Sequence, residues 1–187
     1  ILTTEFAGVI GSTGAINEVI GGTLSLVGGN TQTVSVPGEL WVGSTPDVPA
    51  HLVLDETALN VSSWLTVGRG NGNTGVVSSI TATDSSITCN NFSSGWHNNL
   101  PNDSDQNITL TNTTMVNNGG TFLAEQVNSK TTMVLAGTSS YTSPLRFQMA
   151  INASAEAYLT IQDDSSLTLT GQWFSIGNDG LCVTTVK

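Results

Sequence analysis

The stretch HLVLDETALNVSSWLTVG, residues 51–68, alternates apolar and polar side chains, and the stretch SITATDSSITCNNFSSG, residues 79–95, repeats its pattern. The offsets from Leu54 to the next apolar residues recur after Ala82. A two-residue alternation is the period of a β-strand with one buried side, so both stretches predict short strands. The corresponding apolar residues are Leu59, Val61 and Trp64 in the first stretch and Ile87, Cys89 and Phe92 in the second.

The same pattern returns along the chain at intervals of about 24–28 residues, which is the range expected for one turn of a solenoid. A single copy has too little apolar surface to offset the conformational entropy lost on folding. Stacked copies bury their apolar sides against one another, with strands paired in parallel about 4.8 Å apart. We therefore expect an all-β parallel β-helix of about six to seven coils. The central apolar residues of the copies are Leu26, Leu54, Ala82, Leu110, Leu135 and Ile161.

A large apolar residue stands in the third strand of each predicted coil. Tryptophan columns can be carbohydrate-binding platforms, but alternation with Phe and Leu favours an internal stack of buried side chains. Trp96 falls outside this column at the start of a loop, so we expect it to be the most exposed tryptophan. The predicted column consists of Trp41, Trp64, Phe92, Phe122, Leu145 and Trp173.

The predicted β-helix domain covers residues 23–187, and residues 1–22 are expected to form an N-terminal cap or arm. The final stretch GLCVTTVK, residues 180–187, stops within a strand pattern. Because uncovered strand edges invite pairing, we expect either a longer chain or a partner subunit at this edge. The sequence therefore predicts a homo-oligomer, a filament or contacts with neighbouring structural subunits.

Composition limits the possible partners. The 187 residues include 4 Lys+Arg against 14 Asp+Glu, for a net charge of −10, which argues against nucleic-acid binding. No apolar run reaches the length of about 20 residues that a membrane helix needs, so no membrane insertion is expected. Low charge with abundant Ser and Thr is typical of extracellular, cell-surface and virion proteins. Cys89 and Cys182 fall in coils too far apart for a disulfide, and we expect two free thiols, with Cys89 buried.

Irregular segments follow each third strand and are predicted to emerge on one side of the solenoid, where binding faces commonly lie. Their amides, carboxylates and one indole suit a polar partner such as a glycan, although the alternative is that they are solvated turns. The candidate binding residues are Arg69, Asn71, Asn73, Trp96, His97, Asn98, Asn99, Asp103 and Asp105.

Acidic residues follow the first strand of several coils. Paired carboxylates hydrolyse glycosidic bonds when about 5–9.5 Å apart, so Asp84, Asp163 and Asp164 are candidate catalytic residues of a polysaccharide-cleaving enzyme. The favoured interpretation is turn chemistry, in which Asp caps its own backbone. His51 and His97 lack the spacing of a zinc site. No metal centre and no cofactor are predicted.

The tandem units L-x-L followed by W-[LF]-[TS]-[VI]-G, over roughly residues 23–187, resemble the β-helical repeats of autotransporter passenger domains and of phage tailspike or fibre proteins. The resemblance implies a right-handed parallel β-helix, the usual hand of parallel crossovers. It transfers no catalytic residue. We expect a non-enzymatic structural or adhesive protein, fibre- or decoration-like, on a cell or virion surface. The alternative is a glycan depolymerase or glycan-binding module.

Overall fold

The computed structural model describes residues 2–4, 8–29, 32–70, 76–97, 104–171, 173–177 and 179–187. Within these ranges the protein is all β, and every strand pair is parallel. One sheet has eight strands: β1 (Leu2–Thr4), β4 (Gly22–Val27), β7 (Ala50–Asp55), β9 (Val77–Thr83), β11 (Ser104–Thr111), β14 (Ser129–Ala136), β17 (Glu156–Ile161) and β20 (Leu181–Val186).

The second sheet has twelve shorter or bent strands, which complete each coil. They are β2 (Gly8–Val9), β3 (Ile16–Val19), β5 (Thr33–Val36), β6 (Glu39–Val42), β8 (Ala58–Gly70), β10 (Ser86–His97), β12 (Thr114–Asn117), β13 (Thr121–Leu123), β15 (Ser140–Ser143), β16 (Arg146–Met149), β18 (Ser166–Leu169) and β19 (Trp173–Ile176).

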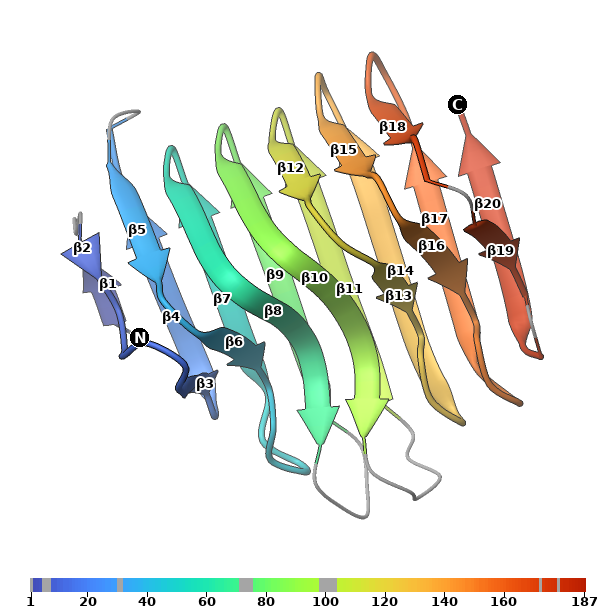
Figure 1. Ribbon diagram of the computed structural model, residues 1–187, viewed down its shortest axis with the longest axis horizontal. Coiled ribbons are helices and arrows are strands. Elements are labelled where there is room, and N and C mark those ends of the chain that lie inside the picture. The colour runs from blue at the N-terminus through green and yellow to red at the C-terminus, as the bar shows by residue number, and fades with distance from the viewer. Residues whose placement is uncertain are drawn as a thin grey trace.

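The two sheets lie face to face and the chain winds between them as one solenoid (Figure 1). In the view of Figure 1 the strands of the eight-stranded sheet ascend behind, those of the twelve-stranded sheet descend in front, and each coil advances toward the C-terminus. This path is right-handed. The predicted right-handed parallel β-helix is therefore confirmed.

The register of the eight-stranded sheet follows the sequence repeat. The central apolar residues of the six copies are direct partners from strand to strand, as predicted from their spacing. The ladder runs through Leu26, Leu54, Ala82, Leu110, Leu135 and Ile161. The segment predicted as a cap or arm also carries strands, and β1, β2 and β3 pair with β4, β5 and β6.

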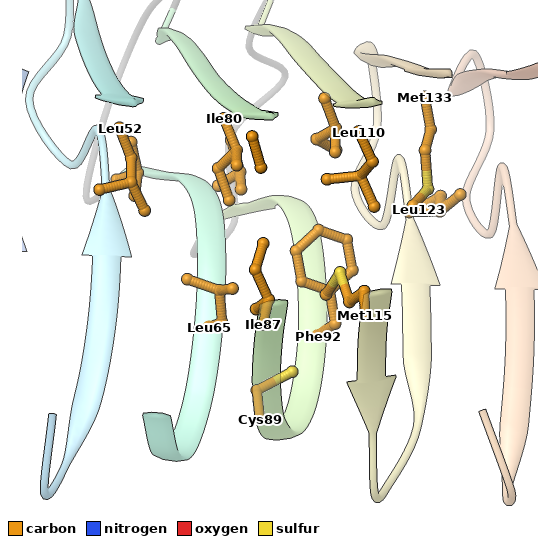
Figure 2. Packing of buried hydrophobic residues seen from close by; sticks show 14 of the residues in the cluster. Leu52, Leu65, Ile80, Ile87, Cys89, Phe92, Leu110, Met115, Leu123 and Met133 are labelled. Carbon is orange, nitrogen blue, oxygen red and sulfur yellow. The ribbon is translucent and has the colours of Figure 1, made fainter. Parts of the chain in front are cut away.

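The core fills the space between the two sheets. Leu52, Ile80 and Leu110 from the eight-stranded sheet point toward Leu65 and Phe92 from the twelve-stranded sheet (Figure 2). Each of these side chains is buried. Repetition of the same inward positions from coil to coil gives one continuous apolar core, which is how a stack of individually unstable repeats becomes stable.

The predicted internal column of tryptophans is wrong. Ser62 and Ser63 of β8 lie opposite the single residue Asn90 of β10, so a β-bulge shifts the register between Cys89 and Asn91. A shift of one residue moves a side chain to the other face of a strand. The inward ladder of the twelve-stranded sheet is consequently Leu40, Leu65, Phe92, Thr121, Phe147 and Phe174.

The residues predicted in that column, apart from Phe92, face outward. Trp64 pairs with Asn91 and is half-buried, and Trp41 is buried outside the core beneath other side chains. Trp173 and Leu145 are 56% and 58% exposed. Phe122 and Trp96 are half-buried, so the prediction that Trp96 is the most exposed tryptophan is wrong, because Trp173 is more exposed. The tryptophans thus become candidates for a binding surface.

Candidate functional site: an aromatic groove on the outer face

Four outward positions on neighbouring strands form the base of the candidate site. Trp41 of β6, Thr66 of β8, Ser93 of β10 and Phe122 of β13 are direct register partners, so their side chains form one row along the solenoid axis. Thr66 and Ser93 are each 1% exposed. Two buried hydroxyls therefore lie between two aromatic residues on the outer face.

Glycines redirect the chain just beyond this row. Gly68 and Gly95 adopt φ values of 72° and 67°, which side-chain-bearing residues rarely adopt. Val67 points into the core, and strict alternation would also turn Arg69 inward. The positive φ at Gly68 interrupts the alternation, and Arg69 instead reaches the outer face. Gly95 has the same effect on Trp96.

Arg69 connects two of the tryptophans. Its guanidinium carbon lies 3.9 Å from the ring centroid of Trp41 and 4.1 Å from that of Trp96. Its Nη1 donates to Glu39 Oε2 at 2.8 Å, and Trp41 Nε1 donates to the same oxygen at 2.7 Å. Desolvation lowers the pKa of Arg69, while nearby Glu39 opposes that shift. The cation is thus held between two indoles and beside a carboxylate.

A second aromatic pair lies beside this group. The rings of Trp64 and Phe122 stack with centroids 6.0 Å apart and planes inclined by 27°. Trp64 of this pair, together with Arg69, Glu39 and Trp96, lines an open groove with a volume of about 190 Å³. The groove is lined by Glu39, Trp64, Thr66, Arg69, Ser93 and Trp96.

The polar groups of the groove are unequally satisfied. Ser93 Oγ donates to Glu125 Oε2 at 2.5 Å, and burial raises the pKa of Glu125, although the bond from Ser93 and the charge of Arg69 oppose the shift. By contrast, Thr66 Oγ1 and Arg69 Nε are buried and have no hydrogen-bond partner. Buried polar atoms without partners are rare because each is costly, and at a groove they indicate a place for ligand atoms.

Arg69 and Trp96 are the predicted binding residues that the structure brings together. Asp105 lies instead on β11 of the other sheet, beside Lys130, its register partner. It lines a separate pocket of about 510 Å³ with Ser104, Asn128, Ser129, Lys130, Ser154 and Glu156. Asn71, Asn73, Asn98, Asn99, Asp103 and the side chain of His97 lie outside the described part of the chain.

Five contributors to the groove were not found from the sequence. Glu39, Thr66 and Ser93 look like ordinary strand residues, and Trp64 was assigned to the core. Glu125 comes from a turn one coil further along the chain. A positive indication was available in the dipeptides Gly68-Arg69 and Gly95-Trp96, because a glycine late in a strand often marks a redirected side chain.

The acidic residues with a predicted catalytic alternative lie in turns. Asp84 and Asp163 have φ values of 47° and 59°; Asp84 Oδ1 accepts from Asn112 Nδ2 at 3.0 Å, and Asp163 Oδ2 accepts from the backbone N–H of Gly137 at 2.9 Å. Three strand spacings separate the two carboxylates, roughly 14 Å, which exceeds the separation used in glycoside hydrolysis. Asp164 follows Asp163 in an exposed turn. The geometry supports a role in turn formation, and catalysis by these residues stays a prediction.

Comparisons with protein-family models, curated proteins and solved structures gave no match. The structure shows the parallel β-solenoid. A relation to autotransporter or tailspike proteins stays a prediction. No helix suited to crossing a membrane occurs among the described residues. In the same residues, no three His, Cys, Asp or Glu side chains cluster as metal ligands do.

Proposed function

We propose that this protein is a non-enzymatic, adhesive β-solenoid that binds glycans through the groove around Trp64, Arg69 and Trp96. The observation that carries the proposal is the unpartnered Thr66 hydroxyl, 1% exposed, in a groove with two indole walls. Binding sites commonly combine apolar and aromatic walls with a few convergent polar groups.

The chemistry of the groove matches a sugar. Sugar rings carry C–H groups on their faces, which pack against indoles, and hydroxyls at their edges, which both donate and accept hydrogen bonds. Trp64 and Trp96 supply the apolar surfaces. Thr66 Oγ1, Arg69 Nε and the carboxylate of Glu39 supply donors and acceptors for hydroxyl groups.

The fold supports an adhesive role, since the groove is built on hydrogen-bonded strands of the twelve-stranded sheet. β6, β8 and β10 hydrogen-bond side by side, so the aromatic walls are fixed by sheet geometry before a ligand arrives. Preorganisation of this kind reduces the entropy that a ligand must overcome on binding. Together with the low charge and high Ser and Thr content, it favours a protein of the extracellular, cell or virion surface.

Binding to a panel of immobilised oligosaccharides tests the proposal. Trp96→Ala removes one groove wall and should weaken binding to any retained glycan by at least about tenfold. Trp173→Ala is the matched control, because Trp173 is 56% exposed and lies outside the groove. Loss of binding in the control to the same extent, or no bound glycan in the panel, would contradict the proposal.

Assembly is a second part of the proposal. Two residues of β19, Phe174 and Ile176, pair with the buried residues Phe147 and Met149 but are themselves 51% and 46% exposed. Leu181 of β20 is 56% exposed. We propose that contact with a second copy of the chain covers these exposed apolar side chains. Light scattering tests it: wild type should exceed the monomer mass and Phe174→Asp should approach it, whereas a monomeric wild type would contradict it.

A further inference from the structure

We infer that the groove around Trp64, Arg69 and Trp96 takes one uncharged sugar residue and rejects acidic sugars. This assignment rests on the proposed glycan binding and narrows it to a class of ligand. It follows from the size of the groove, from the occupied state of its one cation and from its unpartnered polar atoms.

The volume of the groove sets the length of ligand that it can enclose. Its volume of about 190 Å³ is below the roughly 300–1,000 Å³ of most small-molecule pockets. That space, which the indoles of Trp64 and Trp96 line, suits a single sugar ring. A longer glycan would extend beyond the groove, with one residue enclosed.

The cation in the groove is already neutralised. Arg69 is the only one of the four Lys+Arg residues of the chain among the groove-lining residues. Its Nη1 bonds to Glu39, and the rings of Trp41 and Trp96 cover the guanidinium at 3.9 and 4.1 Å. The carboxylate of Glu39 already balances the charge of Arg69, so the carboxylate of an acidic sugar would add an uncompensated negative charge to the groove.

The remaining charge near the groove is negative. Glu125 lies beside Ser93, and Glu39 lines the groove directly. The whole chain adds a net charge of −10. Like charges placed together at an interface oppose binding, so the carboxylate of a uronic or sialic acid would be repelled.

The free polar atoms match an uncharged hydroxyl. Thr66 Oγ1 can donate or accept, and Arg69 Nε carries one N–H donor. Each would gain a partner from a sugar hydroxyl, which also both donates and accepts. An uncharged sugar therefore satisfies the two unpartnered atoms without bringing charge into the groove.

The test compares two sets of oligosaccharides on wild-type protein: neutral hexose-containing and uronic- or sialic-acid-containing. Neutral glycans should bind at least about tenfold more tightly than acidic glycans at physiological salt. Equal or tighter binding of the acidic set would overturn the assignment of ligand class and leave glycan binding itself standing. Absence of binding to both sets would overturn the proposed function and this inference together.

Two substitutions identify the atoms responsible. Thr66→Val removes the unpartnered hydroxyl and should weaken neutral-glycan binding by about threefold to tenfold without lowering the melting temperature. Thr109→Val is its matched control on the outer side of β11, and should leave binding unchanged. Unchanged binding in Thr66→Val would overturn the inference.

Glu39→Gln releases the guanidinium of Arg69 while keeping an acceptor for Trp41 Nε1. The variant should lose discrimination, with the ratio of neutral to acidic affinity falling by about tenfold. An unchanged ratio would contradict the role assigned to the neutralised Arg69.

Discussion

Replacement of Arg69 by Ala tests whether the groove is a rigid, energetically coupled unit. The guanidinium carbon lies within 4.1 Å of two indole centroids and the Nη1 atom lies 2.8 Å from Glu39. The substitution removes both cation–π contacts and the ion pair in one step. We expect a clear loss of stability, although Arg69 lies outside the apolar core.

The magnitude follows from the exposure of the groups. The side chains of Arg69 and Glu39 are 20% and 27% exposed. Each cation–π contact then contributes about 1 kcal/mol, between the values for exposed and desolvated pairs, and the ion pair adds about 0.5–1 kcal/mol. Desolvation of the guanidinium, which also lowers the pKa of Arg69, offsets part of this sum. The expected decrease in the free energy of unfolding is about 2 kcal/mol.

Urea unfolding followed by circular dichroism and by tryptophan fluorescence measures the effect, and coincident curves justify a two-state free energy. Arg146→Ala is the matched control, because Arg146 lies 5.4 Å from the centroid of exposed Trp173. It should cost about 0.5 kcal/mol or less. If Arg69→Ala loses no more stability than Arg146→Ala, the coupling described for the groove is wrong.

Three further outcomes concern the interior and the groove margin. Burial raises the pKa of Cys89 to about 12. In a Cys182→Ser variant, the Cys89 thiol of the folded protein should therefore resist alkylation at about pH 8 and react only when the protein unfolds. Rapid alkylation of the folded protein would contradict the burial of Cys89. Asn117→Ala removes the hydrogen bonds that the side-chain amide donates to Gly120 O and Thr121 Oγ1, both 2.8 Å, and the one that it accepts from the Gly119 N–H. The free energy of unfolding, measured by urea titration, should fall by about 2–4 kcal/mol. For the control Asn90→Ala, at an exposed residue, it should fall by about 1 kcal/mol or less. Burial raises the pKa of Glu125, so the folded state favours the protonated carboxyl group. The stability gained from that proton is complete below pH 4.5, the ordinary pKa of the group, and is lost as the pH rises through its raised pKa in the folded protein. Glu125→Gln should therefore gain melting temperature relative to wild type as the pH rises from about 4 to 7, and a constant difference would contradict the raised pKa.

The solenoid could be predicted from the sequence because its cause is local and repeated. Leu54 and Ala82 begin two stretches with the same apolar offsets, and parallel stacking makes equivalent residues register partners. The same repetition carries the prediction through Leu110 to Leu135 and Ile161. An alternation of two residues and a period in the twenties leave few other ways to bury these side chains.

The aromatic groove was missed because it depends on two interruptions of the repeat. Trp64 stands 28 residues before Phe92 and was aligned with it, but the additional residue at Ser62 and Ser63 makes Leu65 the register partner of Phe92, and no residue type in that stretch announces a bulge. The positive φ at Gly68 brings Arg69 outward as well. Transferring the offset between Cys89 and Phe92 to the coil of Val61 therefore placed Trp64 in the core instead of its neighbour Leu65. The partner Glu125 depends on the register of a later coil, which the sequence repeat defines less sharply.

The indole N–H signals in a two-dimensional NMR titration with a neutral oligosaccharide test glycan binding in the groove most directly. The chain has four tryptophans, so each can be assigned by single substitution. We predict that the signals of Trp64 and Trp96, which line the groove, shift in proportion to bound ligand, while that of Trp173 stays in place. Shifts confined to Trp173, or no shift at saturating concentrations of a glycan that the protein retains, would contradict a binding site in this groove.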